Sequence, residues 1–260
     1  MLDINNIYCG DCFDYFDKID DKSIDMILSD PPYGTIACDW DVVISMAKFW
    51  THAKRVLKNN GSVVLTACQP FTTQAISSNL PAFKYCWVWI KNRPTLPHHS
   101  KNRPMSKYED ICVFSYASMG HKSLLGERRM TYNPQGVSPV VKEKVVTSKG
   151  SHSSHTGPRP NQVGRKYEAL TGLPNNILYF DKEEDHSHPT QKPVKLFEYL
   201  IKTYTNDNEL VLDPFAGSCT TAISAVKCNR NFICIEKDEK YWAVGNNRLY
   251  KFKEANADKK

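Results

Sequence analysis

Apolar residues along the chain form short continuous runs that alternate with segments of helical spacing. Short runs predict strands buried on both faces of a sheet, and they occur at 23–30, 62–68, 83–91, 110–116, 209–214 and 231–236. Helical spacing occurs at 40–58, 193–204, 218–229 and from 238 onward. The first of these helices is expected to end at Asn59-Asn60-Gly61. This alternation predicts an α/β fold, with a parallel or mixed sheet covered by helices on both faces.

The periodic pattern stops between residues 119 and 176. This segment is rich in Gly, Ser, Pro, His and basic residues, and its pattern is typical of a long irregular loop. Such a loop inside a compact domain is usually functional or disordered. The sequence therefore divides into 1–118, an insertion at 119–176, and 177–260.

Composition is that of an ordinary globular protein, with 260 residues, 41% hydrophobic and 24% charged. No apolar run approaches the roughly 18 residues that a membrane span needs, and the N-terminal residues lack the pattern of a signal peptide. Several of the nine cysteines lie in apolar runs, which indicates reduced, buried thiols and a cytoplasmic setting. Cys9 and Cys12 lack a second ligand pair, so no metal is expected.

The net charge of +6 is concentrated in the middle of the chain. Residues 84–169 contain 15 Lys and Arg against five acidic residues, and the rest contains 19 basic and 23 acidic residues. A localised basic segment with aromatic residues favours a polyanionic partner such as nucleic acid. A solvated basic loop is the alternative.

A strand that ends at Asp213 leads into a turn of small residues and then a helix. The next strand ends in Glu236, where doubly wound folds place an acid that accepts hydrogen bonds from ribose hydroxyls. The turn is not a P-loop and lacks the three-glycine pattern of dinucleotide sites, so a purely structural turn is the alternative. Cys219 is expected to lie within the right-handed helix, with a left-handed backbone as the alternative. The candidate cofactor residues of this turn are Asp213, Phe215, Ala216, Gly217 and Ser218.

A second strand ends in Asp30-Pro31-Pro32-Tyr33, where two prolines stiffen the turn. The Asp30 carboxylate and the Pro31 carbonyl can accept the two N–H groups of an exocyclic amine. The ring of Tyr33 can stack on a base that has left its helix. An ordinary turn is the alternative for this motif taken alone.

Together with His188-Pro189-Thr190-Gln191-Lys192-Pro193, these two loops resemble the amino-directed DNA methyltransferases that use S-adenosylmethionine. The motif order resembles the permuted beta group of that family. The resemblance implies a Rossmann-like fold in which 1–118 is the catalytic half, 119–176 the target-recognition insertion and 177–260 the cofactor-binding half. The family commonly has Gly where this chain has Cys219.

Site residues follow from the same resemblance, position by position. Asp30, Pro31, Pro32 and Tyr33 match the catalytic motif, with Asp30 also near the cofactor. Asp213, Phe215 and Gly217 match the cofactor turn, and Glu236 matches the acid that binds the ribose. Thr190 and Lys192 match positions near the methionine end of the cofactor, where Lys192 could face the carboxylate. Asp11 matches an acid near the cofactor adenine.

The implied reaction is methylation of the N6 amine of a flipped adenine in double-stranded DNA. Cytosine N4 is the nearest alternative, although Ser then more often replaces the motif aspartate. Methylation at cytosine C5 needs a Pro-Cys pair, which the chain lacks. An RNA methyltransferase and a catalytically silent DNA-binding module are further alternatives.

Basic side chains in two segments are the candidate DNA contacts, with a solvated linker as the alternative. A homodimer is compatible with these features. The DNA candidates are Arg93, His98, His99, Lys101, Arg103, Lys107, Arg128, Arg129, Arg159 and Arg165.

Overall fold

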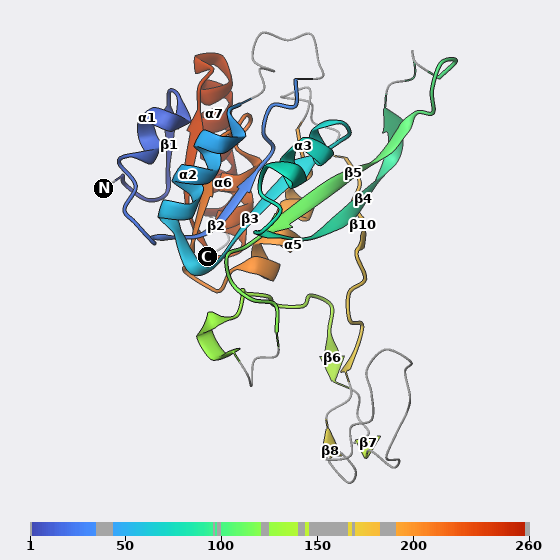
Figure 1. Ribbon diagram of the computed structural model, residues 1–260. Coiled ribbons are helices and arrows are strands. Elements are labelled where there is room, and N and C mark those ends of the chain that lie inside the picture. The colour runs from blue at the N-terminus through green and yellow to red at the C-terminus, as the bar shows by residue number, and fades with distance from the viewer. Residues whose placement is uncertain are drawn as a thin grey trace. The chain divides into compact units, whose positions relative to one another are not determined.

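The computed structural model describes residues 2–34, 44–95, 97, 100–120, 125–139, 144–145, 166–167, 170–182 and 191–257 (Figure 1). The chain forms two compact units, one of residues 1–133 and 176–260, the other of 134–175. The second unit contains two small antiparallel pairs, β6 (Ser138–Pro139) with β9 (Leu170–Thr171) and β7 (Lys144–Val145) with β8 (Lys166–Tyr167).

The larger unit is built on one eight-stranded sheet, in the order β1-β12-β11-β2-β3-β5-β4-β10. β5 is antiparallel to both of its neighbours, and the other pairs in this sheet are parallel. The sheet is therefore mixed and mostly parallel, as predicted. Its strands are β1 (Asn6–Cys9), β2 (Ile24–Ser29), β3 (Leu57–Ala67), β4 (Phe83–Thr95), β5 (Ser106–Phe114), β10 (Ile177–Tyr179), β11 (Leu210–Asp213) and β12 (Asn231–Glu236).

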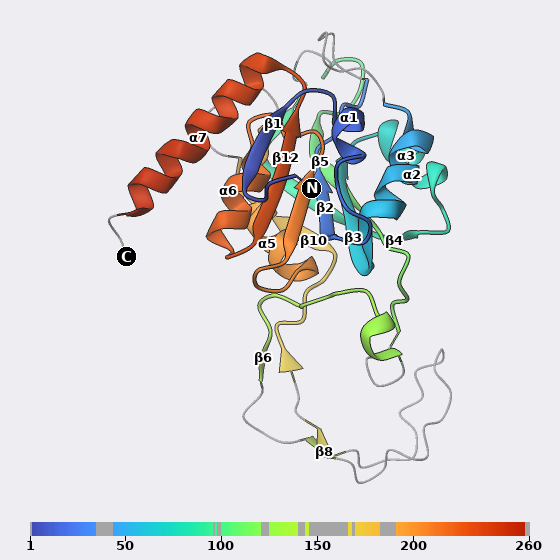
Figure 2. The same cartoon turned by 90° about the vertical axis from the view of Figure 1, so that its left-hand side faces the viewer.

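Helices cover both faces of this sheet (Figure 2). α1 (Cys12–Phe16), α2 (Met46–Val56) and α3 (Phe71–Ser78) contribute to one apolar cluster. α5 (Val194–Tyr204), α6 (Thr220–Lys227) and α7 (Glu239–Ala257) contribute to the other. Successive residues of the central strands point alternately into the two clusters, which explains their continuous apolar runs. Among the described helices, none combines the length and apolar character needed to cross a membrane.

The predicted end of the first long helix is wrong. α2 ends at Val56, and Asn59-Asn60-Gly61 lies within β3. Gly61 is needed there for a close approach, because a Cβ at this position would lie 2.7 Å from the Asp25 carbonyl oxygen. The backbone contact with β2 therefore explains this glycine, which sequence pattern alone assigns to a helix stop.

The parallel strands bring their carboxyl ends to one edge of the sheet. β11 pairs directly with β2, with Val211 opposite Met26 and Leu212 opposite Ile27. Asp213 and Asp30 therefore leave neighbouring strands, although they come from opposite ends of the chain. The late position of the Asp213 turn in the sequence does not separate it from the Asp30 loop in space.

The conformation predicted for Cys219 is also wrong. Cys219 precedes α6 with φ 59° and ψ 38°, in the left-handed region, and Gly217 has φ 51°. A left-handed backbone costs an L-residue about 1–2 kcal/mol relative to Gly. The buried Cys219 side chain fills the space above Gly245 of α7, where an added Cβ would lie 2.3 Å from its Sγ.

The sizes of residues 219 and 245 should therefore be coupled. Gly245→Ala alone should lower the free energy of unfolding by roughly 1–3 kcal/mol through overpacking. Cys219→Gly removes the sulfur and the left-handed strain together, so Gly245→Ala should be tolerated in that background. Urea unfolding of the two single variants and the double variant measures the coupling. Strictly additive effects would contradict this packing relation.

Candidate active site

Charged side chains follow the carboxyl edge of the sheet in the order of its strands. Asp11 follows β1, Glu236 ends β12, Asp213 ends β11, and Asp30 follows β2. Beyond β3, Glu109 lies near the start of the antiparallel β5 and pairs with Trp89 of β4. The single edge thus brings together acids from the first, middle and last thirds of the chain.

The Asp30 carboxylate accepts hydrogen bonds from three side chains. Its Oδ1 accepts from the Tyr33 hydroxyl at 2.5 Å and from the Thr66 hydroxyl. Its Oδ2 accepts from Lys192 Nζ at 2.5 Å. A carboxylate has about four lone-pair positions, two on each oxygen. Oδ1 is saturated by these bonds, and one position on Oδ2 remains for a further donor.

Tyr33 is held as a neutral phenol beside this carboxylate. Burial raises the pKa of Tyr33 well above its ordinary value, and the negative charges of Asp30 and Glu109 raise it further. One face of its ring stacks on Phe71, with centroids 5.1 Å apart and planes at 25°. The predicted stacking of a base would therefore have to use the other face of the ring.

Lys192, in the segment directly before α5, donates a hydrogen bond to Asp30 Oδ2. Its side chain is 7% exposed, and Nζ is also 3.4 Å from Glu109 Oε2. Burial alone lowers the pKa of Lys192, but the charges of Asp30 and Glu109 outweigh burial and raise it above the ordinary value. Contact with a cofactor carboxylate stays a prediction for Lys192. Thr190 lies outside the described residues.

Asp213 is buried at the end of β11 and organises the predicted cofactor turn. It accepts hydrogen bonds from the Ser29 hydroxyl at 2.5 Å, the Thr221 hydroxyl at 2.5 Å and the Phe215 backbone N–H at 3.1 Å. Burial raises the pKa of Asp213 to about 7, although these hydrogen bonds oppose the rise. Asp213 therefore links β2, the turn and α6 rather than facing solvent.

Glu236 joins the turn to the end of the adjacent strand. Its Oε2 accepts from the Gly217 backbone N–H at 2.7 Å, and its Oε1 accepts from the Asp238 N–H at 2.8 Å. Burial raises the pKa of Glu236, against the lowering effect of these N–H groups. Each oxygen retains a lone pair that can accept a hydroxyl hydrogen, as the predicted ribose contact requires.

Asp11 lies beside Glu236, because the Gly10 backbone N–H donates to the Glu236 carbonyl at 2.9 Å. The Asp11 carboxylate accepts from the Phe13 N–H at 3.0 Å, which caps α1, and from Lys237 Nζ at 3.0 Å. Burial would raise the pKa of Asp11, but these donors lower it overall. The carboxylate predicted to bind the ribose and the one predicted to lie near the adenine thus occupy adjacent strand ends.

The rest of the turn is fixed by packing and by one arginine. Phe215 is half-buried and packs near Phe49, and the Ala216 N–H donates to Ile235 O at 3.0 Å. Arg248 of α7 donates to the Ser218 carbonyl at 3.1 Å and the Thr220 hydroxyl at 3.0 Å. Nothing in the spacing around Arg248 predicted this contact.

The predicted DNA contacts divide between the two edges of the sheet. Arg93, Lys101, Arg103 and Lys107 are exposed on the β4–β5 hairpin, which extends from the same edge as Asp30 (Figure 1). Their location is compatible with binding a duplex whose base reaches Asp30. The remaining histidines and arginines of this set lie outside the described residues: His98, His99, Arg159 and Arg165.

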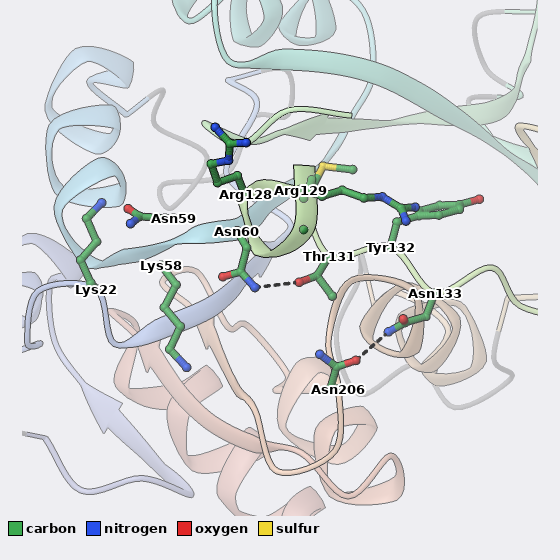
Figure 3. A pocket seen from close by; sticks show the side chains of 12 residues that line it. Lys22, Lys58, Asn59, Asn60, Arg128, Arg129, Thr131, Tyr132, Asn133 and Asn206 are labelled. Atoms are coloured by element: carbon green, nitrogen blue, oxygen red, sulfur yellow. Dashed lines mark hydrogen bonds between the residues drawn. The ribbon is translucent and has the colours of Figure 1, made fainter. Parts of the chain in front are cut away.

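Arg128 and Arg129 lie at the opposite, amino edge. Together with Lys22, Lys58 and Asn60 they line a recess of about 740 Å³ (Figure 3). The β2 strand that separates the two edges has six residues, or roughly 20 Å. Contact of these arginines with DNA stays a prediction, as it does for the hairpin cations at the edge of Asp30.

Several residues of the site carried no sequence signal. Thr66 lies in the apolar half of β3 and Glu109 in the polar first half of β5. Only the sheet brings Thr66 to Asp30 and Glu109 to Lys192. Phe71 lies in α3, a helix that the sequence pattern did not predict. Ser29 directly precedes the Asp30 motif. Its place at the end of a predicted strand was the one sequence feature that could have suggested its contact with Asp213.

Asp213 should make folding stability depend on pH. Its pKa is about 7 in the folded protein and about 3.9 when unfolded. Because the folded pKa is the higher one, the contribution of Asp213 to the free energy of unfolding is complete below about pH 4 and is lost as pH rises through 7. The free energy of unfolding should therefore fall between these pH values, and Asp213→Asn should make that fall smaller by a few kcal/mol. Chemical denaturation between about pH 4 and 7 measures this pH dependence, with the exposed Asp207→Asn as control. If Asp213→Asn leaves the dependence of the free energy of unfolding on pH unchanged, Asp213 does not have the raised pKa.

Comparisons with known proteins agree with this arrangement. The family model described as DNA methylase, for N6 and N4 methyltransferases, matches residues 24–247. The chain is 29% identical to the Type II methyltransferase M1.MboII of Moraxella bovis, over 93% of this chain and 95% of that protein. It is 28% identical to the DNA adenine methyltransferase YhdJ of Escherichia coli K12, over 92% of this chain and 81% of that protein.

Solved structures show the same fold. The M1.HpyAVI–SAM complex has a TM-score of 0.58 at 23% identity and covers 94% of this chain and 99% of its own. The cytosine-N4-specific PvuII DNA methyltransferase has a TM-score of 0.62 at 17% identity, over 96% of this chain and 90% of its own. With the matched family model spanning both the Asp30 and the Asp213 loops, the chain belongs to the N6/N4 amino DNA methyltransferases.

Proposed function

We propose that this chain transfers a methyl group from S-adenosylmethionine to the N6 amine of adenine in double-stranded DNA. The observation that carries the proposal is the Asp30 carboxylate, which keeps one acceptor position on Oδ2 beside the half-buried ring of Tyr33. A carboxylate and the neighbouring Pro31 carbonyl match the two N–H groups of an exocyclic amine.

The cofactor of this family is S-adenosylmethionine, and the residues at the sheet edge fit it. Glu236 and Asp11 offer carboxylate oxygens at adjacent strand ends, suited to ribose hydroxyls and an adenine amine. The left-handed Gly217 and Cys219 keep the backbone of the turn compact. When bound, the cofactor supplies an electrophilic methyl group on a sulfonium sulfur.

The chain itself would act by holding the amine in place. An N–H on Asp30 Oδ2 and another on the Pro31 carbonyl fix the orientation of the nitrogen and leave its lone pair free. Alignment of this kind contributes up to roughly 7–11 kcal/mol in favourable intramolecular reactions. Tyr33 remains a neutral phenol that donates to Asp30 Oδ1, so Oδ2 is the oxygen that faces the amine.

The choice of adenine rests on Asp30 and on the names of relatives such as the adenine methyltransferase YhdJ. Cytosine N4 is the second candidate, because the cytosine-N4-specific PvuII enzyme shares the fold. Both amines need the same pair of acceptors. The size of the base beside Tyr33 would distinguish them.

DNA would lie against the exposed β4–β5 hairpin. Arg93, Lys101, Arg103 and Lys107 are exposed there, at the edge that carries Asp30. Phosphate contacts at this hairpin would offset the few kcal/mol needed to extrude a base. We also propose that the segment 119–176 recognises the target sequence in the DNA.

Asp30→Ala should reduce methyl transfer by at least roughly 100-fold, because the amine loses its acceptor. Binding of S-adenosylmethionine, measured by calorimetry, should change little. The assay uses labelled cofactor and unmethylated DNA, followed by digestion and identification of the modified nucleoside. Asp207→Ala at the amino edge is the control. Active Asp30→Ala protein would refute the catalytic role of Asp30. Detection of N4-methylcytosine as the product would show that the target base is cytosine rather than adenine.

Removing two hairpin charges should weaken DNA binding in a salt-dependent way. Lys101→Ala combined with Arg103→Ala should lower the slope of log K against log salt by about two, one for each phosphate that is no longer neutralised. The matched control removes Lys251 and Lys253, which are exposed on α7. Fluorescence anisotropy with a duplex at several salt concentrations gives both slopes. Equal slopes for the two double variants would show that DNA does not bind the hairpin.

A further inference from the structure

Four charged side chains alternate in sign from the interior of the sheet edge to the catalytic loop. Lys91 Nζ of β4 is 3.4 Å from Glu109 Oε1 of β5. Glu109 Oε2 is 3.4 Å from Lys192 Nζ, which is 2.5 Å from Asp30 Oδ2. These side chains are 2%, 14%, 7% and 21% exposed, in that order. The two lysines are thus almost entirely removed from water, and each contacts Glu109.

Glu109 is connected to Lys192 by charge rather than by a directed bond. Within the described residues, Glu109 Oε2 is buried and accepts no hydrogen bond, although the Lys192 ammonium lies 3.4 Å away. Its Oε1 accepts from Lys91. An interaction without a directed bond is expected to act through charge, and it weakens steeply if the carboxylate is neutralised.

We propose that Glu109 is a positioning residue for methyl transfer: it holds the Lys192 ammonium on Asp30 Oδ2 and so leaves one oriented acceptor position for the substrate amine. The reaction named here rests on the proposed function. The placement of Lys192 by Glu109 does not, because it concerns contacts within the chain.

The position of Lys192 explains why a second acid is needed. A buried ammonium is stable only with compensating charge and hydrogen bonds. If Asp30 were its one acidic partner, Lys192 would depend for compensating charge on the same carboxylate that must accept a hydrogen bond from the substrate amine. Glu109 supplies negative charge from the other side, from a strand that is separate from the catalytic loop.

Other groups also face Lys192 from the surrounding elements. The Tyr33 ring centroid lies 5.8 Å from Nζ. Cys68, at the end of β3, and Lys182, after β10, interact with it electrostatically. Asp30 and Glu109 are the charges that raise the pKa of Lys192. Removing the Glu109 charge should therefore lower that pKa, so that Lys192 loses its proton at a lower pH.

The test compares Glu109→Gln with a matched control, Glu198→Gln. Glu198 is 18% exposed and pairs with Lys227, away from the catalytic edge. The kcat of Glu109→Gln should fall roughly 10- to 100-fold, as expected for a misplaced reacting group. The alkaline limb of its kcat–pH profile should move to lower pH. The KM for DNA and the cofactor affinity from calorimetry should stay within about twofold, and Glu198→Gln should match the unmodified protein in every measurement.

A folded Glu109→Gln protein with unchanged kcat and an unchanged alkaline limb would overturn the proposal. Glu109→Asp serves as the second variant, since it keeps the charge but withdraws it by one methylene. Glu109→Asp should lose less kcat than Glu109→Gln, and the alkaline limb of its kcat–pH profile should move by a smaller amount. If Glu109→Gln fails to fold, wild-type behaviour of Glu109→Asp overturns the proposal instead.

A readout independent of catalysis separates this proposal from the proposed function. The NMR signal of the Lys192 side chain should remain that of the ammonium above the ordinary pKa of a lysine in the unmodified protein. In Glu109→Gln it should titrate at lower pH. Absence of methyl transfer by the unmodified protein would refute the proposed function. An identical Lys192 titration in both proteins would refute the role of Glu109.

Discussion

The ion pair between Lys192 Nζ and Asp30 Oδ2 joins residues that are 162 positions apart in the chain. Both lie at the edge of the sheet, one after β2 and one before α5. A buried charge that loses its partner destabilises a protein by several kcal/mol. The fold therefore has to bring the segment before α5 against the catalytic loop, whatever the order of the two in sequence.

The same edge gives two neighbouring carboxylates different surroundings. Asp30 and Asp213 leave adjacent parallel strands. Burial raises the pKa of Asp213, and the charge of Asp30 adds to that rise. Asp30 instead accepts hydrogen bonds from an ammonium and two hydroxyls. One acid can therefore hold the predicted cofactor turn in place while the other presents an oxygen to the substrate amine of the proposed reaction.

Sequence pattern predicted the strands that coincide with continuous apolar runs. The runs in β2, β11, β12 and the second half of β3, and the amphipathic α5, needed no tertiary information. The pattern misread Gly61, which lies against the Asp25 carbonyl, and Cys219, whose side chain lies against Gly245. Glu109 was missed because its partner Lys192 lies far along the chain, and no local spacing encodes that contact.

The antiparallel β5 determines which connections lie beside the catalytic loop. Because β4 and β5 run in opposite directions, the hairpin between them turns at the edge where β2 and β11 end. By the same geometry, β5 ends and β10 begins at the amino edge, so the segment from 115 to 176 leaves and re-enters the sheet there. The basic hairpin proposed to contact DNA therefore turns at the edge that carries Asp30, and both chain connections to the long insertion lie at the other edge.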